Sequence, residues 1–94
     1  MFNNQRYLTK GVQLEIPLEL QLFMWSCINT VPEPKDYLQI FRLSCVDGKQ
    51  KIIHEQEQPE FKSEYILTVP NPITTKVYVI DSNTYSTMLL AEEY

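Results

Sequence analysis

The chain of 94 residues is 44% hydrophobic and 21% charged, a balance typical of one globular domain, which excludes a disordered chain. Its net charge of -4 disfavours nucleic acid as a partner, because non-specific binding to phosphates depends on Lys and Arg. The longest apolar run, Leu22–Trp25, is far too short to span a membrane, and the amino terminus has no run long enough for a signal peptide. We therefore expect a single cytoplasmic domain over residues 1–94 with no membrane contact.

The first predicted elements are a short strand and a helix. Arg6–Thr9 has the composition of a strand, which the following Lys-Gly pair ends. Pro17 suits the first position of a helix, and Glu19 complements the helix dipole in the first turn. Since Pro32 cannot continue the helix, we expect it to run from Pro17 to about Asn29.

The predicted helix is apolar on two sides. One stripe has the spacing of a sheet-packing face: Leu20, Phe23, Met24, Cys27 and Ile28. A second stripe is left over, and we take it as the candidate partner surface: Leu18, Leu22 and Trp25. Its cover is either the protein's own amino-terminal segment or a curled sheet edge, or another protein or a second copy of this chain. On the second alternative, Trp25 is partly solvent-accessible in the monomer, and Trp25→Ala weakens association without unfolding the domain.

A hairpin follows, centred on Asp47-Gly48, the strongest short-range hairpin signal in the chain. If these two residues form a type I′ turn, the register of the two strands is determined. The pairs on the core face are then Leu43 with Ile52, Phe41 with His54, Cys45 with Gln50, and Gln39 with Gln56. A slip of one residue would turn this whole set to solvent.

After the hairpin, residues 54–64 carry four glutamates and a proline, which favours a solvated connection rather than an acidic catalytic site. Ser63–Val69 alternates apolar and polar side chains and predicts a third antiparallel strand.

A second hairpin is predicted at the carboxyl end, with a strand at residues 76–80, a turn at residues 81–84 and a last strand. Its core face would carry Val77, Val79, Met88 and Leu90. A helix from Asn83 to Glu93 is the competing interpretation. The predicted fold class is α+β, with one helix packed on a mainly antiparallel sheet of four to six strands.

The residues that could carry chemistry are few. His54 is the sole histidine and is already placed on the core face, where we expect a structural imidazole that hydrogen-bonds to an oxygen. Cys27 and Cys45 match neither a disulfide framework nor a zinc spacing, and we expect both to be reduced and buried. With only two glycines, the chain has no phosphate-binding loop, and we expect neither a cofactor nor a metal.

Several pieces of the chain resemble a family of small proteins found in Gram-positive bacteria and in some of their phages, the domain of unknown function family numbered 960. The pieces are RYLTKGV, IPLELQLFMW, DYLQIF, GKQKIIHEQEQPEF and KVYVIDSNTYSTMLLAEEY. The resemblance spans almost the whole chain and implies a bacterial cytoplasmic origin. It implies no activity and no site residue.

The absence of catalytic groups and the surplus apolar stripe favour a non-enzymatic protein–protein interaction module. The first alternative is a small ligand-binding protein or enzyme that uses His54 with a neighbouring tyrosine such as Tyr65. The second is a weak nucleic-acid binder whose contacts are Arg42, Lys49 and Lys51, gathered on the outer face of the central hairpin.

Overall fold

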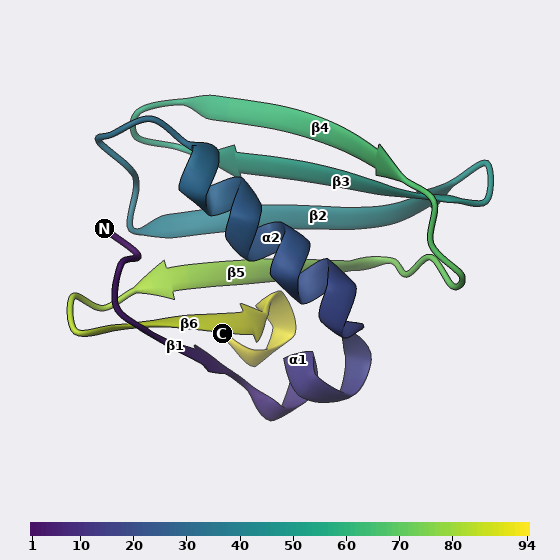
Figure 1. The fold of residues 1–94 in the computed structure, drawn as a ribbon, viewed down its shortest axis with the longest axis horizontal. Coiled ribbons are helices and arrows are strands. Elements are labelled where there is room, and N and C mark those ends of the chain that lie inside the picture. The colour runs from purple at the N-terminus through teal and green to yellow at the C-terminus, as the bar shows by residue number, and fades with distance from the viewer.

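A computed structural model describes residues 1–94 as an α+β fold with one six-stranded sheet. The elements in chain order are β1 (Gln5–Leu8), α1 (Lys10–Glu15), α2 (Leu18–Thr30), β2 (Leu38–Val46), β3 (Lys49–Gln56), β4 (Phe61–Leu67), β5 (Thr75–Asp81), β6 (Tyr85–Leu90) and a single 3-10 turn, η1 (Ala91–Glu93). The strand order across the sheet is β1-β6-β5-β2-β3-β4 (Figure 1). All neighbouring strands are antiparallel except β1 and β6, which are parallel, so the predicted fold class is confirmed.

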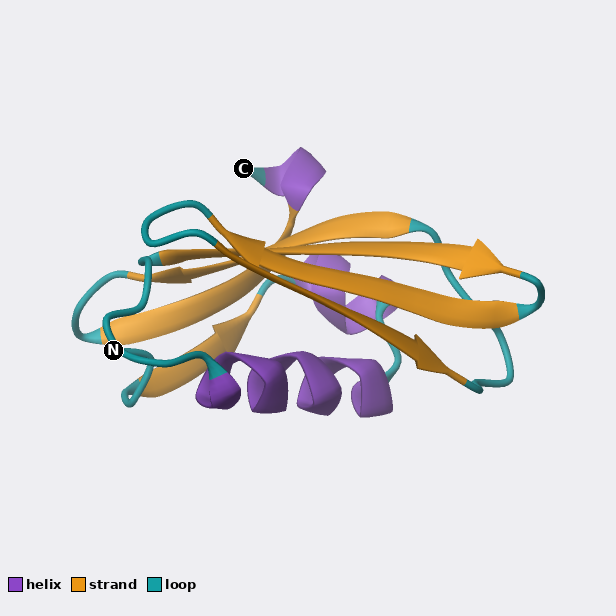
Figure 2. Cartoon of the chain, turned by 90° about the horizontal axis from the view of Figure 1, so that it is seen from above, coloured by secondary structure: helices purple, strands orange, loops and turns teal.

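The two faces of the sheet are covered differently. Figure 2 shows the long helix α2 lying against one face, with the C-terminal turn η1 on the opposite side. The core lies between α2 and the sheet, and its most buried side chains include Leu20, Met24, Ile28, Phe41, Ile52, Val77, Val79 and Met88. None of the helices is both long and apolar enough to cross a bilayer.

The register of the central hairpin is confirmed. Leu43 lies opposite Ile52 and Phe41 lies opposite His54, as the two-residue turn requires. The turn residues Asp47 and Gly48 have φ angles of 52° and 74°, which are the positive values of a type I′ turn. The core list for this hairpin therefore holds, except beside its turn.

That exception is Cys45, which is exposed, so the expectation of a buried thiol there is wrong. It lies next to the tip of the hairpin, which extends beyond the end of α2 (Figure 1). Its neighbour across the hairpin, Gln50, is fully buried. The Gln50 side chain exchanges two hydrogen bonds with the backbone of Ile73, which lies in the loop between β4 and β5. That loop covers one strand of the hairpin and leaves Cys45 in solvent.

Helix α2 begins one residue later than expected, with Pro17 as its N-cap, and the predicted sheet-facing stripe is confirmed. Four of its members are buried, and the fifth, Phe23, packs edge-to-face on Tyr65 of β4 at 5.1 Å between ring centroids. A helix of this length needs such tertiary packing for its stability.

Two boundaries differ from the expectations, and the choice between strand and helix at the carboxyl end is decided. The first strand ends at Leu8, because Thr9 caps a short helix, α1, whose Val12 N–H donates to the Thr9 hydroxyl. The acidic connection shrinks to residues 57–60, because β3 continues to Gln56 and β4 begins at Phe61. At the carboxyl end the strand interpretation is confirmed, and helical structure is confined to η1.

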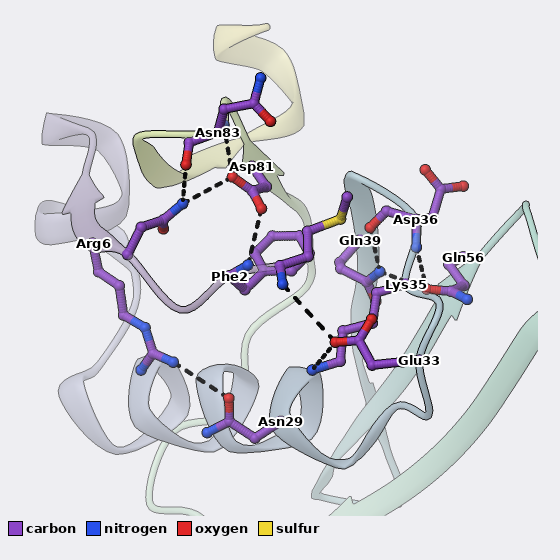
Figure 3. A network of polar contacts seen from close by, with 12 residues as sticks. Phe2, Arg6, Asn29, Glu33, Lys35, Asp36, Gln39, Gln56, Asp81 and Asn83 are labelled. Atoms are coloured by element: carbon purple, nitrogen blue, oxygen red, sulfur yellow. Dashed lines mark hydrogen bonds and ion pairs between the residues drawn. The ribbon is translucent and has the colours of Figure 1, made fainter.

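The amino-terminal segment is tied to the β5–β6 turn by polar contacts (Figure 3). The Phe2 N–H donates to one carboxylate oxygen of Asp81 at 2.9 Å, and the Asn4 side chain donates to the other at 3.0 Å. Burial alone would raise the pKa of Asp81, but hydrogen bonds from Phe2, Asn4 and Asn83 hold it below its ordinary value. These contacts seat the Phe2 ring in the core at 1% exposure.

Candidate functional site

The leftover stripe of α2 is divided by the structure. Leu18 and Leu22 are exposed, at 64% and 59%, whereas Trp25 is only 6% exposed. The expectation of an accessible Trp25 is therefore wrong. Its cover is the amino-terminal segment, because the Arg6 guanidinium of β1 lies over the indole ring at 4.5 Å from its centroid.

Arg6 is held in this position by α2 itself. Its terminal nitrogen donates to the Asn29 side-chain oxygen at 3.4 Å, one turn beyond Trp25 (Figure 3). What remains of the candidate partner surface is Leu18 and Leu22, one helical turn apart. Two exposed leucines without an aromatic neighbour form a narrow stripe, and isolated exposed leucines are common on protein surfaces.

His54 lies in the core and is fully buried. Its ring stacks on Phe41 at 4.3 Å between centroids, and Phe61 meets its edge at 5.4 Å. Its Nε2 atom is 2.6 Å from the side-chain oxygen of Gln39. The expected structural imidazole bonded to an oxygen is therefore what the structure contains.

The hydrogen-bond network fixes the tautomer of His54. The Gln39 amide nitrogen donates to the backbone oxygen of Asp36 at 2.9 Å and to the side-chain oxygen of Gln56 at 2.6 Å. The Gln39 oxygen must therefore accept, and Nε2 of His54 must carry the proton. Nδ1 is left as a buried nitrogen without a partner.

Burial lowers the pKa of His54 to about 4, and the nearby Glu55 carboxylate opposes the shift only in part. The imidazole is neutral at neutral pH. Tyr65, the suggested partner, instead lies near Cys27: burial raises the pKa of the Cys27 thiol, and the Tyr65 hydroxyl lowers it in part. The structure does not bring His54 and Tyr65 together into a solvent-accessible site, and a substrate could reach the imidazole only by displacing the core.

The basic residues of the central hairpin form no surplus positive patch. Arg42 pairs with Glu55 at 2.6 Å, and Lys51 pairs with Glu64 at 3.3 Å. Lys49 is the only one of the three without an acidic partner.

Cys27 and Cys45 are both free thiols, and no group of His, Cys, Asp and Glu side chains is arranged to hold a metal ion.

The widest candidate site is the sheet face opposite α2, which we name the open face. Strand alternation places mainly apolar side chains of four adjacent strands there, and we name this region the apolar half: Tyr7, Leu38, Ile40, Tyr78, Ile80, Tyr85, Thr87 and Leu89. Leu89 is buried among its neighbours, whereas Tyr7 and Tyr85 are exposed. Cross-strand pairs link it, since Ile40 lies opposite Tyr78, and Tyr78 lies opposite Leu89. The apolar half is continuous from β1 to β2.

Aromatic contacts confirm that these side chains share one face. Tyr7 and Tyr85 meet edge-to-face at 5.6 Å, and they remain 52% and 43% exposed. Tyr94 follows η1 onto the same face and meets Tyr78 at 5.5 Å. Apart from this turn, the apolar half has no covering layer (Figure 2).

The remainder of the open face, over β3, β4 and the adjoining part of β2, is charged with both signs. It contains a shallow hollow of about 380 Å³ whose lining includes Arg42, Glu55, Glu60 and Lys62. Its lining also includes Glu57, so three carboxylates face two cations and the hollow has no strong preference for an anionic ligand. The charged strands flank the apolar half as a polar rim flanks a contact centre.

Sequence reasoning missed the apolar half because its members are scattered. Along the central hairpin, Ile40 alternates with core-facing residues and lies opposite Glu55, a pattern typical of ordinary surface. Only the strand order brings β5 beside β2, and β1 beside β6. Tyrosine and isoleucine at alternate positions of the predicted strands were the available signal.

The sequence itself identifies the family. The model of the family described as "Staphylococcal protein of unknown function (DUF960)" matches residues 5–93. The chain belongs to this family. The resemblance found in the sequence is therefore confirmed, and no curated protein matches the chain.

A solved structure has the same fold. The crystal structure of a protein of unknown function from Enterococcus faecalis superimposes with a TM-score of 0.81, covering 97% of this chain and 91% of that one. The two sequences are 23% identical, so this similarity concerns the fold alone.

Proposed function

We propose that the protein is a non-enzymatic protein–protein interaction module that binds another protein against the apolar half of its open face. The observation that carries this proposal is that one face of the sheet is packed under α2 while the other presents tyrosine and aliphatic side chains that only η1 and Tyr94 cover in part, with Tyr7 and Tyr85 the most exposed of them. A solvated sheet face normally carries polar side chains. An apolar one points to a contact surface.

The composition of the apolar half supports a protein as the partner. Tyrosine supplies a large apolar ring and a polar hydroxyl, and it is enriched where proteins bind one another. Nucleic acid fits less well, because the chain is negatively charged overall and Arg42 and Lys51 are already paired. The two free thiols support a cytoplasmic location, where cysteines stay reduced.

Affinity capture from a staphylococcal lysate tests the proposal with two matched double variants. Tyr7→Thr with Tyr85→Thr removes two exposed rings from the open face, and threonine preserves the strands. Leu18→Gln with Leu22→Gln removes two exposed apolar side chains from α2 and preserves the helix.

We expect a protein retained by the wild type to be retained equally by the leucine variant and to be lost from the tyrosine variant, by about ten-fold or more. Retention by the tyrosine variant with loss from the leucine variant would move the contact to α2. A captured species that nuclease removes would contradict a protein partner.

A further inference from the structure

A second contact surface lies at the edge of the sheet rather than on its face. β4 ends the sheet on the side opposite β1, and no ribbon lies beyond it (Figure 1). It has seven residues, whereas the other edge strand, β1, has four. An edge strand of this length presents unpaired backbone donors and acceptors that can pair with another strand.

The side chains of β4 alternate between the two faces. Lys62, Glu64 and Ile66 are exposed on the open face, and Phe61, Ser63 and Tyr65 lie half-buried on the α2 side. Lys62 forms no ion pair, because Glu55, directly opposite it on β3, is bound to Arg42. The strand therefore carries a free cation, Lys62, two residues before the carboxylate of Glu64, which pairs with Lys51 of the same chain at 3.3 Å.

We propose that two copies of this chain form a two-fold symmetric dimer in which their β4 strands pair antiparallel, with Ser63 opposite the same residue of the second copy. In this register Lys62 of each copy lies opposite Glu64 of the other, which gives two opposite-charge pairs. On the other side of the sheet, Phe61 of each copy lies opposite Tyr65 of the other. Two pairs of half-buried aromatic rings thus extend the core across the junction.

The neighbouring registers lack this complementarity. Centring the pair on Glu64 would oppose two carboxylates at the axis, and centring it on Lys62 would oppose two ammonium groups there. Centring it on Tyr65 would leave Glu64 opposite Ile66 and Lys62 without an anion. Centring it on Phe61 would oppose Lys62 and Glu60 but would pair most of β4 with the turn at residues 57–60, outside the strands. Because like charges directly opposite destabilise a strand pair, the sequence of β4 favours the register centred on Ser63.

The dimer would join two six-stranded sheets into one and would place both α2 helices on the same face. The two open faces would become continuous, and neither apolar half would be covered. This inference therefore does not depend on the proposed function, since it uses the sheet edge and not the apolar half.

Sedimentation equilibrium over a concentration series tests the dimer with charge variants. Lys62→Glu and Glu64→Lys each place like charges opposite one another in both pairs, so each should weaken dimerisation by about ten-fold. An equimolar mixture of the two variants restores both opposite-charge pairs between the copies, so it should form heterodimers about ten-fold tighter than the homodimer of either variant, although the Lys51–Glu64 ion pair stays broken in the Glu64→Lys copy. Lys49→Glu is the matched control, because it makes the same change of charge at an unpaired lysine away from β4.

If the mixture regains affinity, the weaker dimerisation of each variant alone is not due to misfolding, because each chain in the mixture still carries its own substitution. A wild type that stays monomeric up to millimolar concentration would overturn the proposal. So would a mixture that dimerises no better than either variant alone, or a Lys49→Glu variant weakened as much as Lys62→Glu.

Discussion

At the scale of single residues, His54 couples the stability of the fold to pH. Burial lowers the pKa of its imidazole from the ordinary 6.5 to about 4 in the folded protein. Between these values the unfolded chain binds a proton that the folded chain does not, so stability falls as the pH falls. We expect a loss of roughly 3 kcal/mol in the free energy of unfolding between about pH 7 and pH 4 from this residue.

Urea unfolding at several pH values measures this loss, and His54→Gln isolates it. Glutamine does not titrate, and its amide can still donate to Gln39, so the variant should lose only the part of the pH dependence that belongs to the imidazole. Equal pH dependence of the variant and the wild type would show that His54 is solvated. The carboxylates that titrate in the same range contribute equally to both proteins.

Trp25 is predicted to be a core residue in its effect on stability. Because its ring is 6% exposed beneath Arg6, Trp25→Ala should lower the free energy of unfolding by about 3–5 kcal/mol. The exposed Leu18→Ala should change it by less than about 0.5 kcal/mol, and it serves as the control. Chemical denaturation measures the two stability changes, and the emission maximum of Trp25 reports the burial of its ring. A red-shifted emission together with an unchanged stability of Trp25→Ala would contradict this placement.

At the scale of elements, the sequence predicts what is local and repeated. The β2–β3 register follows from two turn residues, and the sheet-facing stripe of α2 follows from its period. The short helix α1 has no such signal, because its six residues are stabilised from far along the chain. Glu93, 82 residues beyond Gly11, accepts hydrogen bonds from the Thr9 hydroxyl at 2.6 Å and the Gly11 N–H at 3.2 Å.

Glu93 is therefore predicted to hold α1 against the end of β6. The hydrogen bond from Thr9 is the main cause that lowers the pKa of this carboxyl, so the charged form makes the contact. Glu93→Ala should speed amide hydrogen exchange in α1 and at Leu90, whose N–H also donates to Glu93 at 2.8 Å. Glu92→Ala, the exposed neighbour, should leave this exchange unchanged. If amide exchange in α1 and at Leu90 is as slow in Glu93→Ala as in Glu92→Ala, Glu93 does not hold α1 in place.

At the scale of the whole molecule, the proposed contact surface depends on which strands are neighbours. The α+β class and the antiparallel strands were predictable from alternation and turns, but the parallel placement of β1 beside β6 was not. That placement sets Tyr7 beside Tyr85 and extends the apolar half to the edge of the sheet. The same placement brings Arg6 over Trp25. Trp25 is therefore not available in the candidate partner surface on α2, where the sequence predicted it.

The central claim is that the open face, and not α2, is the contact surface for another protein. Hydroxyl-radical footprinting of the free protein and of the complex recovered by affinity capture tests it residue by residue. We predict that oxidation of Tyr7 and Tyr85 falls in the complex, because both rings become covered, while Leu18 and Leu22 remain as reactive as in the free protein. Protection of Leu18 and Leu22 with unchanged oxidation of the two tyrosines would contradict the claim.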